Sequence, residues 1–236
     1  MALERRNRMK FWRILFVLLL AGCAAPTATP ASAYFPLAKG TTWTYSYRPY
    51  QPAADPNQIV SAEYRLTETV TKVTTTAGVT VAHVQSTLSP VQVPAEFPAL
   101  TLPAEFWYVV RGTQVFQSNT PLDPAAVDPS KLILAFDMPL SVNRSWCAQQ
   151  ADPKAPTGTS VPGCENGGKT SVLQAAATRV PAGNFESCYQ LQTFYNDGSF
   201  FQWFCTGVGV VSVQYDHNGT RFGFQQELTR FTPGTH

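Results

Sequence analysis

The chain has few charged side chains: only 14% of its 236 residues are Asp, Glu, Lys or Arg, against about a quarter in ordinary globular proteins. It has three histidines, and it contains no H-E-x-x-H, C-x-x-C or G-x-S-x-G sequence. These absences remove the sequence signatures of a zinc protease, a thiolate metal site and an α/β-hydrolase nucleophile. No glycine-rich phosphate-binding loop precedes a helical pattern. We therefore expect no cofactor, no metal site and no enzyme activity.

Long apolar runs are also missing. The most apolar stretch, Ile14–Leu20, is much shorter than the roughly 20 residues that a membrane-spanning helix needs. It follows a cluster of five basic residues and is followed by small residues and a cysteine, Leu20-Ala21-Gly22-Cys23. A basic cluster, a short apolar run and small residues before a cleavage point are the order found in secretory signal peptides.

The cysteine at the cleavage point makes residues 1–22 resemble a bacterial lipoprotein signal peptide, with Leu20-Ala21-Gly22-Cys23 as the lipobox. The resemblance implies that residues 1–22 are removed and that Cys23 carries a diacylglycerol and usually an N-acyl chain. The protein would then be extracytoplasmic and lipid-anchored, on the cell membrane or the outer membrane. The alternative is an uncleaved membrane anchor in which Cys23 is incidental.

Removal of the leader changes the sign of the charge. Residues 1–22 hold five basic residues and one acidic residue, so the remaining 214 residues have 12 basic and 14 acidic side chains and a net charge of −2. No basic stripe remains, which argues against nucleic acid as a partner. The expected partners are a membrane, through Cys23, and an unknown protein or apolar ligand.

The rest of the chain has the composition of an all-β protein. It is rich in Thr, Val, Gln and aromatic residues, and 19 prolines are spread along the chain, which disfavours long helices. Residues 23–33 read as a Pro/Thr/Ala tether, and residues 34–236 read as one β domain with a polar insertion at 148–170. The fold class we expect is a strongly curved antiparallel sheet, either a sandwich or an open barrel.

One spaced motif occurs twice, with Pro-Leu followed at fixed spacing by Gly or Asn and then by Trp. The two copies are Pro36-Leu37…Gly40…Trp43 and Pro139-Leu140…Asn143…Trp146. Gly and Asn are the residues that adopt positive φ most readily. A long strand pair with an Ala-Gly turn follows each copy, at Ala77-Gly78 and Ala182-Gly183. These repeats suggest two similar halves, 34–130 and 131–236, with coincidence among common β-sheet patterns as the alternative.

Four cysteines remain after Cys23, an even number that indicates two disulfides in an exported chain. Three pairings are possible, and we favour Cys147–Cys164 with Cys188–Cys205 because each closes a local loop. A Cys₄ metal site is the competing interpretation, which the absence of any C-x-x-C pair disfavours.

Three segments resemble a group of uncharacterised bacterial lipoproteins and secreted proteins. Residues 34–45 match a YFPLxxGxxWxY segment, residues 180–188 a VPAGxF segment, and residues 203–211 a W-x-x-x-GVG-x-V segment. The resemblance implies a β-rich domain of the cell envelope and implies no activity. The second copy of the Pro-Leu motif departs from the pattern, because Asn143 stands where glycine is usual.

The function we expect is a non-catalytic, lipid-anchored binding or assembly module. One alternative is a carrier of an apolar ligand such as an acyl chain, which requires an internal apolar cavity of several hundred Å³. The other is a carboxylate-dependent hydrolase, which requires at least two acidic side chains in one cleft. Its candidates are Glu96, Glu105, Asp123, Asp128 and Asp137. We expect His83 and His217 to be surface and turn residues, and the tryptophans to be core residues.

The anchor can be tested on the native protein. Radiolabelled palmitate should be incorporated into the wild type, and Cys23→Ser should abolish the label. Mass spectrometry of the mature N-terminus should find an acylated Cys23. Retention of Met1, or labelling that persists in the variant, would contradict the anchor.

Overall fold

The computed structural model describes residues 31–55, 57–128, 131–148, 164, 168–195 and 197–235. The leader, Cys23 and most of the 148–170 insertion lie outside the described residues, as does His236. None of the helices in this described part is long and apolar enough to span a membrane.

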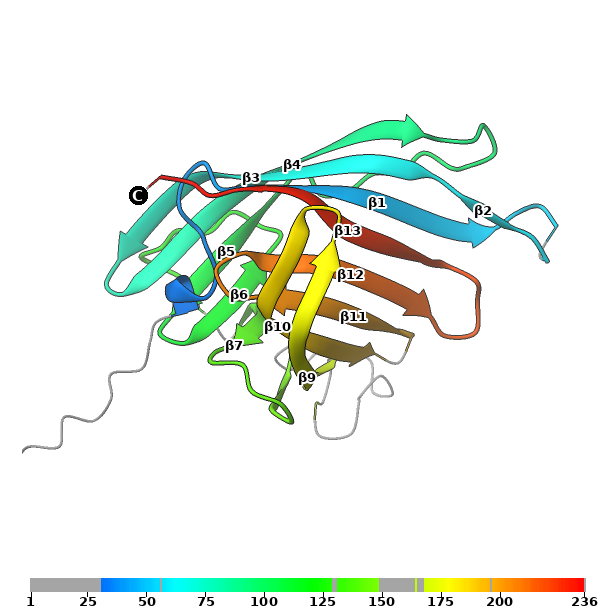
Figure 1. Ribbon diagram of the computed structural model, residues 1–236. Helices are drawn as coiled ribbons and strands as arrows, with labels where there is room; N and C mark the ends of the chain where they lie inside the picture. Colours follow the sequence, from blue (N-terminus) through cyan, green and yellow to red (C-terminus); the bar gives the residue numbers. More distant parts are fainter. Residues whose placement is uncertain are drawn as a thin grey trace, which may run out of the picture.

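Nearly all of the regular structure is antiparallel β-sheet, as expected from the composition (Figure 1). One short 3-10 helix, η1 (Ala31–Ala33), precedes the strands. The strands are β1 (Thr42–Pro52), β2 (Ile59–Ser61), β3 (Glu63–Thr76), β4 (Val79–Gln92), β5 (Glu105–Arg111), β6 (Gln114–Ser118), β7 (Ile133–Asp137), β8 (Ser145–Cys147), β9 (Lys169–Val180), β10 (Gly183–Tyr195), β11 (Gly198–Cys205), β12 (Gly209–His217) and β13 (Gly223–Thr232).

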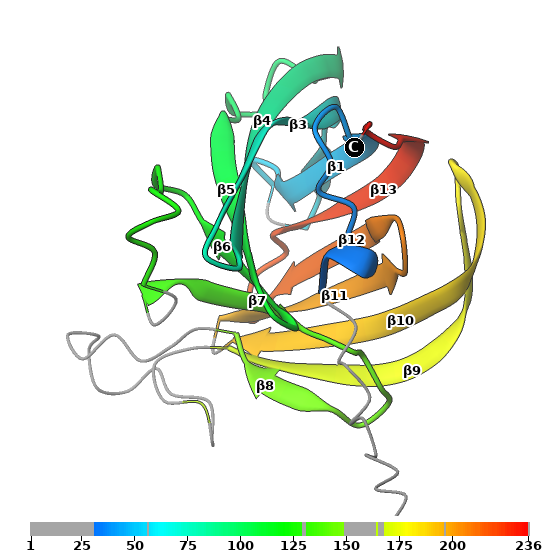
Figure 2. The ribbon, with the colours of Figure 1, turned by 90° about the vertical axis from the view of Figure 1, so that its left-hand side faces the viewer.

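The strands form one continuous sheet built from two meanders. Its order is β7-β6-β5-β4-β3-β1-β13-β12-β11-β10-β9-β8, with β2 paired to β1 off this path. The sheet curls round until β7 and β8 approach each other, and Figure 2 looks into the resulting open barrel. The prediction of a strongly curved antiparallel sheet is therefore confirmed, in its open-barrel form.

The first half of the chain forms one meander, β1 to β7, and the second half forms the other, β8 to β13. The two copies of the Pro-Leu motif make the same hydrogen bonds. Gly40 donates its backbone N–H to Val70 on β3 over 2.8 Å, and Asn143 donates to Val172 on β9 over 2.9 Å. Gly40 and Asn143 both have positive φ, at 87° and 70°, as the choice of Gly and Asn indicates.

Tight turns fix the register of the hairpins. At the β3–β4 turn, Ala77 and Gly78 have φ of 49° and 79°, while Thr76 pairs with Val79. Two consecutive positive φ values define the mirror-image turn whose twist matches that of paired strands. The predicted hairpin across Ala77-Gly78 is thus confirmed.

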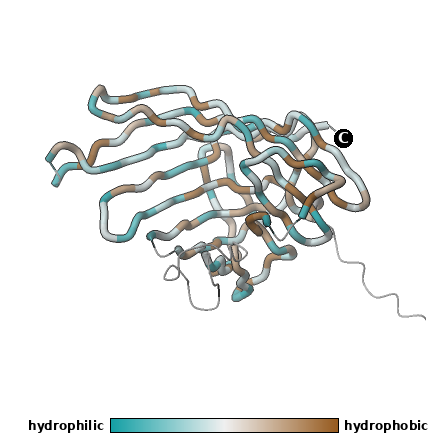
Figure 3. The backbone as a smooth tube through the Cα atoms, turned by 180° about the vertical axis from the view of Figure 1, so that it is seen from behind, coloured by the Kyte–Doolittle hydropathy of each residue, from teal (hydrophilic) through white to brown (hydrophobic). Residues whose placement is uncertain are grey.

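The side chains alternate between the inside of the barrel and solvent. Figure 3 shows hydrophobic and hydrophilic residues alternating along many of the strands. On β1, Trp43, Tyr45 and Tyr47 are all buried, whereas their neighbours are more exposed. This period of two is the pattern expected of strands with one face against a core.

The segment before β1 closes one end of the barrel, and we call residues 31–37 the N-terminal plug. Its backbone is tied to the β5–β6 turn by Ala31 N–H to Gly112 C=O, 3.0 Å, and to the β11–β12 turn by Gly207 N–H to Tyr34 C=O, 2.8 Å. Phe35, only 2% exposed, extends into the core. The rings of Trp43, Tyr108, Phe136 and Phe204 lie 4.8–6.0 Å from it, centroid to centroid.

The four cysteines form two disulfides, each between cysteines that are 17 residues apart in the sequence. Cys188 and Cys205 lie directly opposite each other on β10 and β11 and are bonded across the ladder. Cys147, at the end of β8, is bonded to Cys164. The Cys₄ metal site is thereby excluded, because all four sulfur atoms are in disulfides.

Removing the ring of Phe35 from the plug should destabilise the domain. Phe35→Ala should lower the free energy of unfolding by about 3–5 kcal/mol, the usual cost of removing a buried phenylalanine ring. Urea denaturation followed by tryptophan fluorescence measures it. Lys39→Ala, at an exposed position close by in the sequence, should change stability by no more than about 0.5 kcal/mol. A loss below 1 kcal/mol in Phe35→Ala would show that the plug does not close the core.

Candidate functional site inside the barrel

One acidic side chain occupies a core-facing position. Strand β3 turns Tyr64, Leu66, Glu68 and Val70 to the same face, and the three neighbours of Glu68 in this row are buried. Glu68 lies directly opposite Trp43 in the β1–β3 ladder and opposite Ser86 in the β3–β4 ladder. Successive residues of a strand alternate between the two faces, so the side chain of Glu68 points into the barrel.

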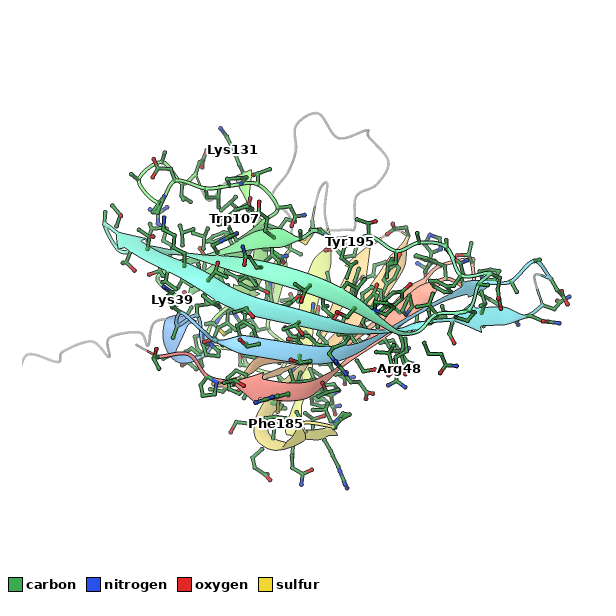
Figure 4. All side chains as sticks on the ribbon, turned by 90° about the horizontal axis from the view of Figure 1, so that it is seen from above. Lys39, Arg48, Trp107, Lys131, Phe185 and Tyr195 are labelled. Carbon is green, nitrogen blue, oxygen red and sulfur yellow. A yellow bond between two sulfur atoms is a disulfide. The ribbon has the colours of Figure 1, made fainter. Side chains whose placement is uncertain are left out.

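Glu68 lines a cavity of about 210 Å³ whose walls come from both meanders. The volume is below that of pockets for drug-sized ligands, about 300–1,000 Å³. Tyr195, labelled in Figure 4, belongs to the wall contributed by β10. The lining combines the aromatic residues Phe35, Trp43, Tyr45, Tyr108, Phe136 and Tyr195, the aliphatic residues Ile133, Leu134, Ala135, Ala148, Val210 and Val213, and the polar residues Glu68, Gln117, Thr170, Thr193, Gln202 and Gln226.

A second pocket of about 240 Å³ adjoins this cavity on the side away from Phe35. The two share four lining residues: Glu68, Tyr108, Gln117 and Gln226. The second pocket continues past them to Tyr47 and Phe224. Together the two pockets form an interior trough, with Glu68 at its middle and the N-terminal plug at one end.

Glu68 makes no hydrogen bond or ion pair within the part of the chain that the structure describes. Its side chain is half-buried and lines the trough. Burial raises its pKa from the ordinary 4.5 to about 7, because the charged form loses its hydration. Lys, Arg and His are absent from the described residues that line the two pockets. This described lining therefore holds one acid and no base.

The aromatic residues next to Glu68 are fixed by the opposite meander. Trp43 donates its indole N–H to the carbonyl of Val208 over 2.6 Å, and Tyr45 donates its hydroxyl to the carbonyl of Val210 over 3.0 Å. Burial, and then the charge of Glu68, raise the pKa of both Tyr45 and Tyr108 well above the ordinary value. Both tyrosines therefore stay neutral at physiological pH.

The trough also contains three glutamines with unused hydrogen-bonding capacity. Gln117, Gln202 and Gln226 come from β6, β11 and β13, and their side-chain amides bond to none of the described residues. By contrast, Thr170 and Thr193 bond to each other over 2.8 Å. Unsatisfied polar groups that face a cavity are the groups that orient a bound molecule.

The five carboxylates proposed for a hydrolase do not line the trough. Four have local partners and Glu96 is exposed on a loop. The partners are His83 at 2.9 Å from Glu105, Arg144 at 2.5 Å from Asp137, Lys131 at 3.7 Å from Asp128, and the backbone N–H of Ala125 at 3.0 Å from Asp123. The described residues also contain no group of three or more His, Cys, Asp or Glu that could hold a metal ion.

The histidines and tryptophans have structural surroundings. The ring of His83 stacks on Trp107 at 4.9 Å, and the ring of His217 lies 2.9 Å from the hydroxyl of Thr220 in the β12–β13 turn. Trp43, Trp107 and Trp146 are buried. Core packing was the role predicted for them, although Trp43 also contributes to the trough.

The sequence comparisons found no match for this chain, and the similar solved structures are only 12–14% identical to it. No protein-family model matches it, and no curated protein matches it in sequence. Among solved structures it is similar to a Bacteroides fragilis protein described as exported and as having a YmcC-like fold, at 14% identity over 84% of this chain and 98% of the other, with a TM-score of 0.45.

A protein of Parabacteroides distasonis described as a lipoprotein has 12% identity over 85% of this chain and 99% of its own, with a TM-score of 0.42. A structure of MucB has 12% identity over 87% and 56%, with a TM-score of 0.32. All three TM-scores are below 0.5, so these proteins say nothing about what this chain binds.

The raised pKa of Glu68 predicts how stability depends on pH. Between pH 4.5 and 7 the folded protein holds a proton that the unfolded chain releases, so the stability contributed by protonated Glu68 is complete below about pH 4.5 and lost as the pH rises through 7. From pH 5 to pH 8 the free energy of unfolding should fall by about 2–3 kcal/mol more in the wild type than in Glu68→Gln.

Urea titrations at each pH measure this difference. Glu186→Gln, at an exposed position on β10, is the control and should keep the pH dependence of the wild type. Parallel curves for the wild type and Glu68→Gln would contradict a carboxyl that titrates near neutrality.

Proposed function

We propose that the protein is an extracytoplasmic, lipid-anchored binding module that takes a small ligand into the interior trough and catalyses no reaction. The observation that carries the proposal is the row of polar side chains without partners, Glu68 with Gln117, Gln202 and Gln226, on the inner face of a barrel. These four side chains are half-buried, so their polar atoms face the trough and are not sealed in the core. A bound ligand would make the hydrogen bonds that solvent otherwise supplies.

The composition of the trough also limits the kind of ligand. A carrier of acyl chains needs an apolar tunnel, whereas six of the residues that line the 210 Å³ cavity are polar. The aromatic and aliphatic residues on the same walls favour a ligand with an apolar body. We therefore propose a compact ligand with both apolar and polar parts in place of a long acyl chain.

The location rests on the sequence. The lipobox around Cys23 and the resemblance to the YFPL-type lipoproteins support a mature protein held at the surface of a membrane. Disulfides such as Cys188–Cys205 form and persist in oxidising compartments outside the cytoplasm, which supports this location.

Filling the trough should weaken binding of a neutral apolar probe. The fluorescence of N-phenyl-1-naphthylamine should rise when it enters the wild-type trough, and Val213→Phe, on the β12 wall, should lower its affinity at least tenfold. Ser212→Phe adds the same ring at the neighbouring position of β12, which faces out of the barrel, and should bind the probe like the wild type. Equal binding in both variants, or none in the folded wild type, would refute the proposal.

A further inference from the structure

The charge inside the trough has one sign. Among the described residues, Glu68 is the only Asp, Glu, Lys or Arg in the lining of either pocket. Surface carboxylates of this protein do have cationic partners, as the ion pairs Arg48–Glu227 and Arg144–Asp137 illustrate. Glu68 is thus a half-buried, inward-facing acid whose counter-ion is not supplied by the described part of the chain.

Three aromatic residues line the cavity together with Glu68. Trp43 is its partner in the β1–β3 ladder, and Tyr45 and Tyr108 line the same cavity. Aromatic rings attract cations through the negative potential of their faces, by about 0.5–2 kcal/mol for each ring. A carboxylate among aromatic rings is the set of groups that binds an organic ammonium ion.

We infer that the ligand is a small organic ammonium ion, with its cationic head at Glu68 among Trp43, Tyr45 and Tyr108 and its apolar body along the trough. The inference rests on the proposed function. It accounts for the missing base, because the ligand itself supplies the positive charge. An anionic ligand is disfavoured by the charge of Glu68, and a neutral ligand would leave the ionised carboxylate unpaired.

Among the described residues, the titratable groups that line the trough with Glu68 are all tyrosines: Tyr45 and Tyr47 on β1, Tyr108 on β5 and Tyr195 on β10. Burial raises the pKa of each of them, so none adds charge near neutral pH. Glu68 is then the group whose ionisation controls binding. A cation binds the ionised form, so its affinity should rise with pH through the range where Glu68 loses its proton.

Isothermal titration calorimetry with three cations and two matched neutral molecules tests the inference. The cations are tetramethylammonium, choline and benzylamine; 3,3-dimethyl-1-butanol replaces choline and benzyl alcohol replaces benzylamine. At pH 8 at least one cation should bind, and its neutral counterpart should bind at least tenfold more weakly. The affinity for choline or tetramethylammonium, whose charge does not change with pH, should be about tenfold lower at pH 6 than at pH 8.

Glu68→Gln should weaken cation binding at least tenfold and remove its pH dependence, while Glu186→Gln should bind like the wild type. Binding of N-phenyl-1-naphthylamine shows in the same samples that each variant retains an intact trough. If that probe binds but no cation does at 10 mM, or if the neutral counterparts bind equally well, the ammonium inference is wrong and the proposed function stands. If neither the probe nor any cation binds, both fail.

Discussion

Everything in this structure depends on the pairing of the first strand with the last. Nine residue pairs between β1 and β13, from Thr42↔Thr232 to Tyr50↔Gly223, join the two meanders into one sheet. Without this ladder each meander would expose an edge strand and the inner faces would not meet. The ladder brings Tyr47 opposite Gln226, and so connects the β3 wall that carries Glu68 to the glutamines of the second half. The trough is a product of closure and belongs to neither half alone.

The two meanders share the Pro-Leu motif, but they place different side chains opposite its tryptophan. Trp43 pairs with Glu68 in the first meander, and Trp146 pairs with Thr170 at the matching place in the second. Thr170 has its hydroxyl satisfied by Thr193, whereas Glu68 has no such neighbour. A position that could hold a self-satisfied threonine thus carries an acid that costs stability at neutral pH. Groups of this kind are more often kept for binding than for folding.

The local structure can be predicted from the sequence, whereas the candidate site cannot, for a physical reason. Turns depend on a few adjacent residues, so Ala77-Gly78 and the positive φ values of Gly40 and Asn143 can be predicted from short motifs. The alternation Tyr64, Leu66, Glu68, Val70, with polar residues between them, marks Glu68 as inward-facing, so this signal was present in the sequence. Whether an inward position faces packed side chains or open space depends on strands far away in the chain. The acids singled out in the sequence, such as Asp123 and Asp137, do not line this cavity, and their partners are local.

The position of the N-terminal plug has a consequence for how the molecule stands on a lipid surface. The described chain begins at Ala31, at the end of the barrel that Phe35 closes, and only seven residues lie between Cys23 and Ala31. The eight Cα-to-Cα steps from Cys23 to Ala31 span at most about 29 Å. With lipid on Cys23, the end of the barrel that the plug closes would lie within about 29 Å of the bilayer. The Tyr47–Phe224 end of the trough lies farther along the barrel from this tether. A molecule arriving at that far end would come from the aqueous side and would not have to pass through the headgroups.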